Sequence, residues 1–584
     1  MTKILFKRKK AWGLSAWCRV LSLTLAFAVS PLAAGPQHPE AVSPATAHLA
    51  SGLSLLRSGN ASAALSEFQE ACRLDPNSAQ ALVLVGVAQN QLGNVQQAMT
   101  ALRHALQLDP ASEAAHYNLA MSLAQLKQTD DAIHELRSVL KLNPQSSLAH
   151  YNLGVLLEDR GDYQGAIQDL LAVKKAQPDD AAALFHLVRA YYGAGNSTQA
   201  IRVAQEAASY DSKGELAVRL AQLMIRHNDF EQAVQLLAPI RARVQVSPAL
   251  DMTLARAYIG AGELRKAIGL LEVHERDDPS WQSAYLLGLA YVSDKRPEPA
   301  IAAFRNSLRR NPNQAEGHFR LGKLLLGATN ESDQQAGLEE LHQAIALDSH
   351  TSEYYEVLGR WLLQREKLKE AIEVLDQGIK AGTPSAELEA LMGLAQAALH
   401  GGASAKPFAE KALQQDSRMA LAHYLVGFCY FNAGDYAQAV EYYKQATKLD
   451  PRDDLFYYNT ALALQRLNRV SEALPYAQRS TEINPGRSLN HYLLGKLYTK
   501  LNRNDEAVPE LETSIRLNPR LDNSYYLLSL IYERSGNTIK AQGMRDKLAQ
   551  LKHTREGEAI IESPESAVHE MILPSRLLQN HDLR

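Results

Sequence analysis

The sequence predicts an all-α protein, built as a solenoid of stacked antiparallel helix pairs. Prolines recur every 34 residues near both ends of the chain, as Pro76, Pro110, Pro144 and Pro178 and again as Pro451, Pro485 and Pro519. Small residues keep the same period, as Gly52, Gly86, Ala120 and Gly154 and, further along each unit, as Ala64, Ala98, Ala132 and Ala166. A fixed period of this length indicates many small repeated units and not one large globule.

Each repeat is numbered so that its proline falls at position 32. The proline predicts the end of the second helix, because it disfavours the helical conformation of the residue before it. The small residues at positions 8 and 20 predict a close approach of the two helices, since larger side chains would hold the axes apart. One helix pair cannot bury its apolar face alone, so neighbouring repeats must cover it. The sequence predicts about fifteen such repeats between Ala45 and Arg555.

The repeat resembles the tetratricopeptide repeat (TPR). The resemblance is carried by residues 149–154 (AHYNLG) and 161–166 (GDYQGA), and it returns along the chain. It implies a right-handed α-α superhelix with one concave and one convex face. In that family, first-helix positions 2, 5, 6, 9, 12 and 13 line the concave groove.

The chain divides by regularity. Residues 1–34 are a leader and 35–44 a short linker; 45–214 hold five regular repeats, 215–280 two degenerate ones with a predicted bend, 281–555 eight more, and 556–584 a loosely ordered tail. Within the degenerate pair, Pro239 is expected to interrupt a second helix and Arg241–Ser247 to form an inserted loop. A second insertion is expected between the helices of repeat nine, at Ala328–Ser332. Ser471 and Asp505 are expected to cap second helices just before Pro475 and Pro509.

The leader has the composition of a secretory signal peptide. Its basic start has no acidic residue, an apolar run follows from Leu21 to Val29, and small residues close it before Gly35. This pattern predicts export to the periplasm or the medium, with cleavage after Ala34. The alternative is an uncleaved inner-membrane anchor at residues 21–34, which would be the chain's one membrane contact.

Charge and cysteine content exclude some function classes. The chain has 61 basic and 64 acidic residues, and six of the basic ones lie in the leader, so the cleaved chain carries a net charge of about −9. Nucleic-acid binding needs a basic footprint, and none is expected here. Cys72 and Cys429 lie too many repeats apart to form a disulfide within the chain.

No catalytic or cofactor motif is found. Phosphate-loop, nucleophile-elbow, HExxH and CxxC patterns are absent, and the GAG tracts at 193–195 and 260–262 fall at turns between helices, without the strand a dinucleotide loop follows. The sequence therefore predicts no cofactor, no metal site, no small-molecule substrate and no enzymatic activity. Five histidines share position 4 and are interpreted as packing residues between repeats: His116, His150, His318, His423 and His491.

Candidate binding residues lie at the groove positions that the resemblance implies. An aromatic stripe with a cationic rim in repeats twelve to fourteen predicts the main protein-binding site: Tyr424, Phe428, Phe431, Tyr458, Asn459, Leu462, Tyr492, Lys496 and Lys500. Asparagines can clamp an extended peptide backbone through their donor and acceptor, so a secondary site is predicted at Tyr117, Asn118, Tyr151 and Asn152. The alternative for each residue is ordinary packing against neighbouring helices.

The leading functional hypothesis is an exported, non-enzymatic scaffold that binds protein or peptide segments in its groove, with cell-envelope assembly as the setting. The alternative is a substrate-recruiting subunit of an enzyme complex, for example a glycosyltransferase, with the catalytic domain on another chain. Too few residues follow the last repeat for a catalytic domain of its own.

Overall fold

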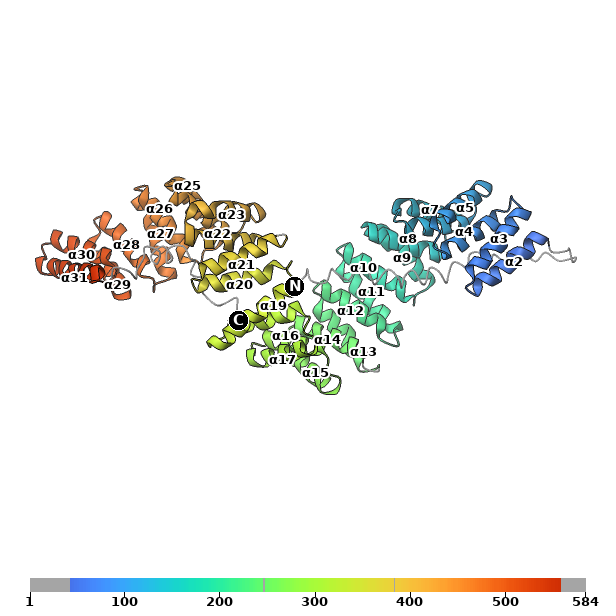
Figure 1. Ribbon diagram of the computed structural model, residues 1–584, viewed down its shortest axis with the longest axis horizontal. Coiled ribbons are helices and arrows are strands. Elements are labelled where there is room, and N and C mark those ends of the chain that lie inside the picture. The colour runs from blue at the N-terminus through green and yellow to red at the C-terminus, as the bar shows by residue number, and fades with distance from the viewer. Residues whose placement is uncertain (1–42, 245–246, 383, 558–584) are drawn as a thin grey trace. The chain divides into compact units, whose positions relative to one another are not determined.

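The structure is a computed structural model that describes residues 43–244, 247–382 and 384–557, and every regular element in these ranges is an α-helix (Figure 1). The helices follow one another as fifteen antiparallel pairs. Contacts divide the chain into two compact bodies at Pro279 and Ser280, and each body is described by itself. The predicted all-α solenoid of helix pairs is confirmed.

The N-terminal body holds seven pairs. They are α2 (Pro44–Arg57) with α3 (Ala61–Leu74), α4 (Ala79–Gln91) with α5 (Val95–Leu108), α6 (Glu113–Gln125) with α7 (Thr129–Leu142), α8 (Ser147–Arg160) with α9 (Tyr163–Ala176), α10 (Ala181–Gly193) with α11 (Ser197–Tyr210), α12 (Glu215–Arg226) with α13 (Phe230–Arg241), and α14 (Pro248–Gly260) with α15 (Leu264–Asp277).

The C-terminal body holds eight pairs. They are α16 (Trp281–Ser293) with α17 (Pro297–Arg310), α18 (Ala315–Leu326) with α19 (Glu331–Leu347), α20 (Ser352–Gln364) with α21 (Leu368–Lys380), α22 (Ala386–His400) with α23 (Gly402–Gln415), α24 (Ala420–Asn432) with α25 (Tyr436–Leu449), α26 (Asp454–Arg466) with α27 (Val470–Ile483), α28 (Ser488–Lys500) with α29 (Asn504–Leu517), and α30 (Asp522–Arg534) with α31 (Thr538–Gly557).

Local sequence signals begin and end the helices of the regular repeats. The Ser78 hydroxyl accepts a hydrogen bond from the Ala81 N–H at 3.2 Å and so caps α4. The turn between first and second helices needs a left-handed residue, and Gly93 supplies it after α4 with φ 81°. Helix α5 ends at Leu108, just before the Asp109–Pro110 pair. These signals recur with the repeat, which is why the helix boundaries follow the sequence period.

The small residue at position 8 sets the distance between the two helices of a pair. A Cβ at Gly154 would lie 2.7 Å from the Leu170 Cγ, and one at Gly86 would lie 2.6 Å from the Leu102 Cγ. Both distances are shorter than any real carbon–carbon contact. The close approach that the glycines predicted is therefore confirmed.

Prolines inside second helices do not end or delay them. Helix α13 continues through Pro239 to Arg241, so the predicted interruption is wrong; buried Leu236, Leu237 and Ile240 hold this part of the helix in the core. Helices α27 and α29 begin before Ser471 and Asp505 and contain Pro475 and Pro509, so the predicted delayed caps are also wrong. Each proline removes one backbone hydrogen bond, and tertiary packing outweighs that loss.

The expected insertions are accommodated in two ways. Arg241, the first residue of the predicted loop, still belongs to α13, and the described residues between α13 and α14, 242–244 and Ser247, are not helical. In repeat nine the connection runs only from Gly327 to Asn330, and Glu331 and Ser332 already belong to α19, which is 17 residues long. The extra residues thus mainly lengthen the second helix.

The region 215–250 is expected to exchange its backbone amides faster than 79–178 or 420–521. Pro239 removes a hydrogen bond from α13, and the connection from α13 to α14 separates its repeat from the next, so fewer interactions oppose local opening. Hydrogen exchange followed by mass spectrometry measures this directly. Equal protection along all three segments would contradict it. The bend proposed for 215–280 stays a prediction.

Candidate functional site

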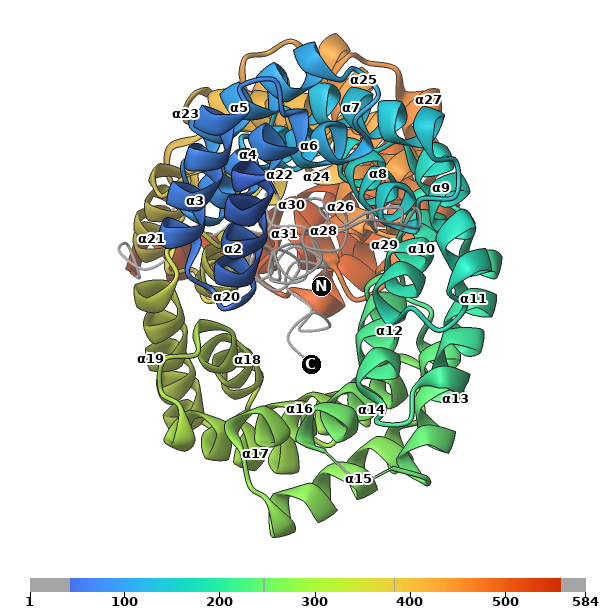
Figure 2. The same ribbon diagram turned by 90° about the vertical axis from the view of Figure 1, so that its right-hand side faces the viewer.

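First helices line one face of each body. Successive first helices contact each other directly, for example α26 with α28 and α28 with α30, whereas second helices mostly contact the first helices beside them. Figure 2 shows α12 and α14 on the inner side of the N-terminal body with α13 and α15 on its outer side, and α16 and α18 on the inner side of the C-terminal body with α17 and α19 on its outer side. We call this inner side the first-helix face.

Most of the predicted aromatic stripe is buried in the core. Tyr424, Phe428, Tyr458, Asn459 and Leu462 are all less than a tenth exposed, and Tyr424 is fully buried. The Tyr424 ring lies 5.1 Å from the Phe456 ring and 5.7 Å from the Tyr443 ring, which belong to neighbouring helices. These five residues therefore cannot anchor a partner in this conformation, and their assignment to the binding surface is corrected to core packing.

The asparagines use their amides within their own helices. Asn459 Nδ2 donates to the Leu455 carbonyl at 3.0 Å, and Asn118 and Asn152 make the same bond four residues back, to Ala114 and Leu148. Asn118 is buried. These bonds use one of the two N–H groups of each amide, and burial keeps the rest of the Asn118 and Asn459 side chains from a partner, which corrects the clamp prediction for these two residues.

The secondary site is tied into the packing between repeats. Asn152 Nδ2 also donates to the Tyr117 hydroxyl at 3.1 Å, and burial raises the pKa of Tyr117 to about 12. Tyr151 is half-buried, with its ring 5.9 Å from the His186 ring in an edge-to-face arrangement. Of the four residues of the secondary site, only Tyr151 and Asn152 are partly exposed to solvent.

Four predicted residues remain accessible on the first-helix face. Phe431, Tyr492 and Lys496 are half-buried and Lys500 is exposed. Lys496 Nζ lies 5.6 Å from the centre of the Tyr492 ring. Burial, together with the nearby charges of Lys500 and Arg466, lowers the pKa of Lys496 below its ordinary value. The structure thus brings Lys496 and Lys500 into one cationic cluster beside Tyr492.

Two residues of this surface were missing from the prediction. Arg466, at position 13 of repeat thirteen, joins the cationic cluster from α26. Tyr526, at position 5 of repeat fifteen, is 51% exposed on α30, whereas the position-5 Tyr424 and Tyr458 are covered. The signal for Arg466 was in the sequence, since Lys500 occupies the same position of the next repeat. The signal for Tyr526 is its place in the last repeat: Tyr424 at the same position packs on Phe456 of the following first helix, and among the described residues no first helix follows α30.

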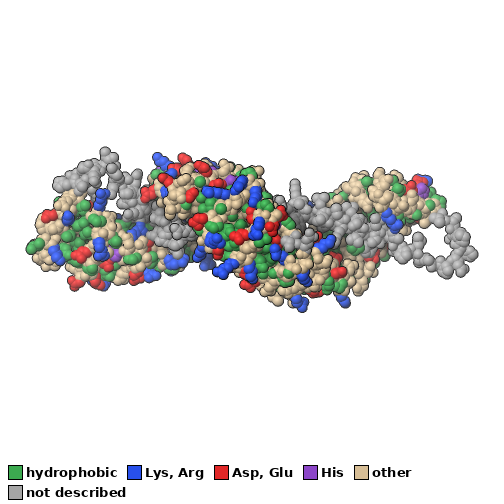
Figure 3. Space-filling model, turned by 90° about the horizontal axis from the view of Figure 1, so that it is seen from below, with side chains coloured by type: hydrophobic (Ala, Val, Ile, Leu, Met, Phe, Trp, Pro, Cys, Tyr) green, Lys and Arg blue, Asp and Glu red, His purple; other side chains and the backbone are tan. Residues whose placement is uncertain are grey.

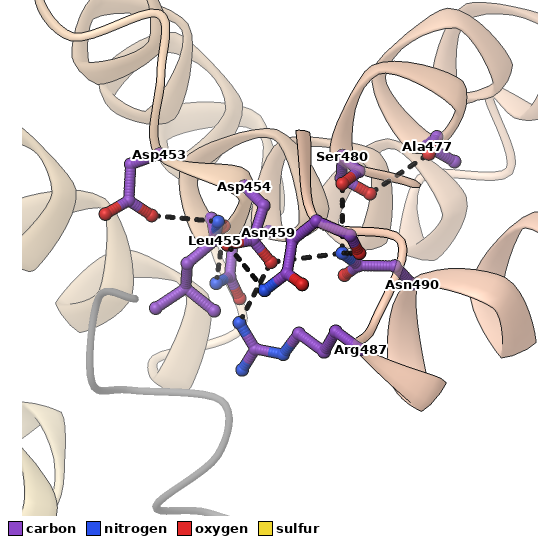
Figure 4. Close-up of polar contacts among 9 residues, drawn as sticks. Asp453, Asp454, Leu455, Asn459, Ala477, Ser480, Arg487 and Asn490 are labelled. Carbon is purple, nitrogen blue, oxygen red and sulfur yellow. Dashed lines mark hydrogen bonds and ion pairs between the residues drawn. The ribbon is translucent and has the colours of Figure 1, made fainter. Parts of the chain in front are cut away.

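A buried polar cluster fixes α26, α27 and α28 behind this surface (Figure 4). Asp454 Oδ2 accepts from Asn490 Nδ2 at 3.0 Å and from Arg487 at 3.3 Å. Asn490 Nδ2 also reaches the Ser480 carbonyl at 3.0 Å. The cluster links the start of α26 to α27 and to α28, so the helices that carry Arg466, Lys496 and Lys500 are held at a fixed spacing.

Four of the five position-4 histidines join helices inside the fold, whereas His423 reaches only a backbone carbonyl, that of Ser417, at 3.0 Å from Nε2. In His116, His150, His318 and His491 one ring nitrogen contacts a carboxylate of the second helix and the other the carbonyl of the preceding proline, as His150 does with Asp169 (2.7 Å) and Pro144 (3.1 Å). Tyr355 and Tyr525 donate to the equivalent backbone carbonyls. The ring therefore joins two helices of one repeat to the end of the repeat before, a fuller role than the packing expected between repeats.

Two of these histidines, His318 and His491, predict a pH dependence of stability. Hydrogen bonds to Glu340 and Glu510, aided by a proline carbonyl and opposed by burial, raise the pKa values of His318 and His491. Because the folded-state pKa lies above the unfolded value of about 6.5, the stabilisation is complete below that pH and is lost as pH rises through the folded pKa. Urea unfolding of the C-terminal repeats should therefore occur at lower urea above neutral pH than below pH 6. His318→Gln/His491→Gln should flatten this dependence; an unchanged slope in the variant would contradict it.

The described residues hold no sign of a metal centre: they contain no group of three or more His, Cys, Asp or Glu side chains placed to bind an ion. Over the same residues, no helix is both long and apolar enough to cross a membrane. The GAG tracts lie at the turns from α10 to α11 and from α14 to α15, as expected. The leader and the tail beyond Gly557, with the calls made on them, lie outside the described residues.

A family model described as tetratricopeptide repeat matches residues 49–113, 117–181, 285–346, 357–417 and 429–488, which is more than half of the chain. A second model of the same description matches residues 490–521. Comparison with curated protein sequences finds no match.

Several solved structures are similar to this chain at low identity. A structure of Naa15/Naa10 bound to HypK-THB is 14% identical, covers 92% of this chain and 99% of that chain, and has a TM-score of 0.33. The APC/C hetero-tetramer Cut9-Hcn1 is 14% identical over 78% of this chain and 97% of that one, with a TM-score of 0.35. MamA from Desulfovibrio magneticus RS-1 is 23% identical over 29% of this chain and 95% of that one, with a TM-score of 0.27.

Proposed function

Because the chain belongs to the tetratricopeptide repeat family, we propose that it is a non-enzymatic scaffold that binds a protein segment on the first-helix face of its C-terminal repeats. The observation that carries the proposal is the accessible surface formed by Tyr492, Lys496 and Lys500 on α28, Arg466 on α26 and Tyr526 on α30. Aromatic area beside cationic groups is a common composition of interface anchors.

The helices behind this surface favour binding without a large rearrangement. The Asp454 cluster links α26, α27 and α28 through bonds of 3.0 to 3.3 Å. A surface held in this way loses little conformational entropy when a partner binds, and that favours affinity. The role we propose for the protein is thus to present a rigid face to an extended segment.

Export and a role in cell-envelope assembly are part of the proposal and rest on the leader. Amino-terminal sequencing of the native protein is expected to begin near Gly35. Recovery of a chain that starts at Met1 from the cytosol would contradict export. A chain that starts at Met1 in the membrane fraction would instead favour the uncleaved anchor.

Photo-crosslinking tests the binding face. A benzophenone amino acid replaces Tyr526, which is 51% exposed on a first helix, and in a control replaces Tyr210, which is 48% exposed at the end of the second helix α11. Irradiation of cells should give discrete adducts at position 526 and few at 210. The two sites are matched in side chain and exposure, and they differ in the face they present and in the body that carries them.

Adducts of equal yield at both positions, or at 210 alone, would overturn the assignment of the first-helix face. The identity of any adduct is obtained from mass spectrometry.

A further inference from the structure

We infer that the segment bound on the first-helix face of α26, α28 and α30 is acidic, with clustered Asp or Glu side chains next to an apolar residue. The inference rests on the proposed function and names the chemistry of the partner. Its basis is the basic cluster, defined as Arg466, Lys496 and Lys500, together with Tyr492 beside it and the exposed Tyr526 on the next first helix, α30.

The basic cluster lacks internal counter-charges. Among the described residues, no ion pair is formed by any of its three cations. Other arginines of repeats thirteen and fourteen do have one: Arg469 with Glu472, Arg479 with Glu482, Arg487 with Asp454 and Arg503 with Glu506. On the face drawn in Figure 3, basic and acidic side chains are mixed. The three cations of the cluster differ from the paired arginines, because none of them has an ion-pair partner among the described residues.

The arrangement also carries a cost that a carboxylate would remove. Lys496 and Lys500 are four residues apart on α28, a spacing at which like charges destabilise a helix. Lys496 is half-buried, and the only nearby charges that shift its pKa are the two other cations, which lower it together with burial. An anionic group at this place would be attracted by all three cations and would oppose the lowering of the Lys496 pKa.

The tyrosines indicate that the bound segment also contains an apolar residue. Tyr492 lies under Lys496, with 5.6 Å between Nζ and the ring centre, and Tyr526 exposes half of its side chain on the next first helix. Their rings offer apolar area beside the cations. A segment with an apolar side chain flanked by carboxylates matches both parts.

Nucleic acid is the other anionic partner and is disfavoured. The full chain has a net charge of −3, so a phosphate backbone is repelled outside the cluster, whose three cations are few for such a polymer. A short acidic segment interacts only with the charges of the cluster and does not extend over the acidic remainder of the surface.

The decisive experiment selects peptides from a random displayed library on the full-length protein. Sequences recovered on the wild type are expected to contain more Asp and Glu than the starting library. On Lys496→Gln/Lys500→Gln this acidic enrichment should disappear. Lys444→Gln/Lys448→Gln is the matched control, because these lysines have the same spacing on the second helix α25; it should behave as the wild type does.

Affinity measurements then give the size of the effect. A recovered acidic peptide, labelled with fluorescein, should bind Lys496→Gln/Lys500→Gln at least about fivefold more weakly than the control, and its binding to the wild type should weaken with salt. Circular dichroism should show both variants folded, since neither Lys496 nor Lys500 contributes an ion pair to the described structure.

The outcomes separate this inference from the proposed function. If the recovered peptides are no more acidic than the library, or bind both variants equally, the inference of an acidic partner is contradicted. The proposed scaffold function is not affected by that result. Oligonucleotide binding that requires Lys496 and Lys500 would also overturn it. Failure to recover any peptide, together with an absence of adducts at position 526, would contradict the proposed function itself.

Discussion

Gly337→Ala is expected to lower the free energy of unfolding of the α18–α19 pair by about 1–3 kcal/mol. A Cβ at Gly337 would lie 2.8 Å from the Leu326 nitrogen and 3.0 Å from the Gly322 oxygen. Both are backbone atoms, so no side chain can rotate away and the two helix axes must separate. This is the one pair in which glycines of both helices face each other among those that the structure describes.

Gly269→Ala is the matched control. Gly269 lies within α15, and a Cβ there would meet no atom within 4 Å. Both substitutions gain the same helix propensity, so the control should be neutral or stabilised by up to about 1 kcal/mol. Hydrogen exchange of α18 and α19, read beside urea unfolding, measures the local effect. Equal stability of the two variants would show that the helices do not approach as closely as described.

Asp454→Ala is expected to destabilise repeats thirteen and fourteen by about 3–5 kcal/mol. Asp454 is 1% exposed and accepts hydrogen bonds from Arg487 and Asn490. Its removal leaves the half-buried Arg487 guanidinium without a carboxylate and frees the Asn490 amide from one partner. An uncompensated buried charge is among the largest single penalties that a substitution can impose.

Glu482→Ala provides the comparison. Its ion pair with Arg479 is 2.9 Å long, but both side chains are more than half exposed, and such pairs contribute about 1 kcal/mol or less. Amide exchange in α26, α27 and α28 should accelerate in Asp454→Ala and change little in Glu482→Ala. If both variants retain wild-type protection, the buried cluster does not hold the helices together.

The fold was predictable because its signals are local and recur. Proline, glycine and capping serine act on the few residues around them, so their period located the fifteen helix pairs. The sequence predictions were wrong where tertiary packing outweighed a local signal. Pro239 and Pro475 each remove one hydrogen bond, but the buried side chains of α13 and α27 keep those helices continuous.

The candidate site was predictable in part. Lys496, Lys500 and Tyr492 lie on the surface that the repeat positions indicated, and Arg466 completes it. Tyr424 and Tyr458 occupy the same repeat position as Tyr526, yet they are buried while Tyr526 is half exposed. An aromatic stripe has the same residue pattern whether it packs in the core or binds a partner, so the pattern alone does not distinguish the two.

The sequence by itself determined the number of repeats, the place of the helices apart from bounds near a few prolines, and the residue types on their inner side, because these depend on chemistry repeated within one short unit. Only the tertiary structure decided which of those side chains a partner can reach and which cations lack a counter-charge. Exposure and charge pairing depend on residues from neighbouring helices, 30 or more positions away, such as Asp454 and Asn490. Those contacts arise from stacking between repeats and have no period in the sequence.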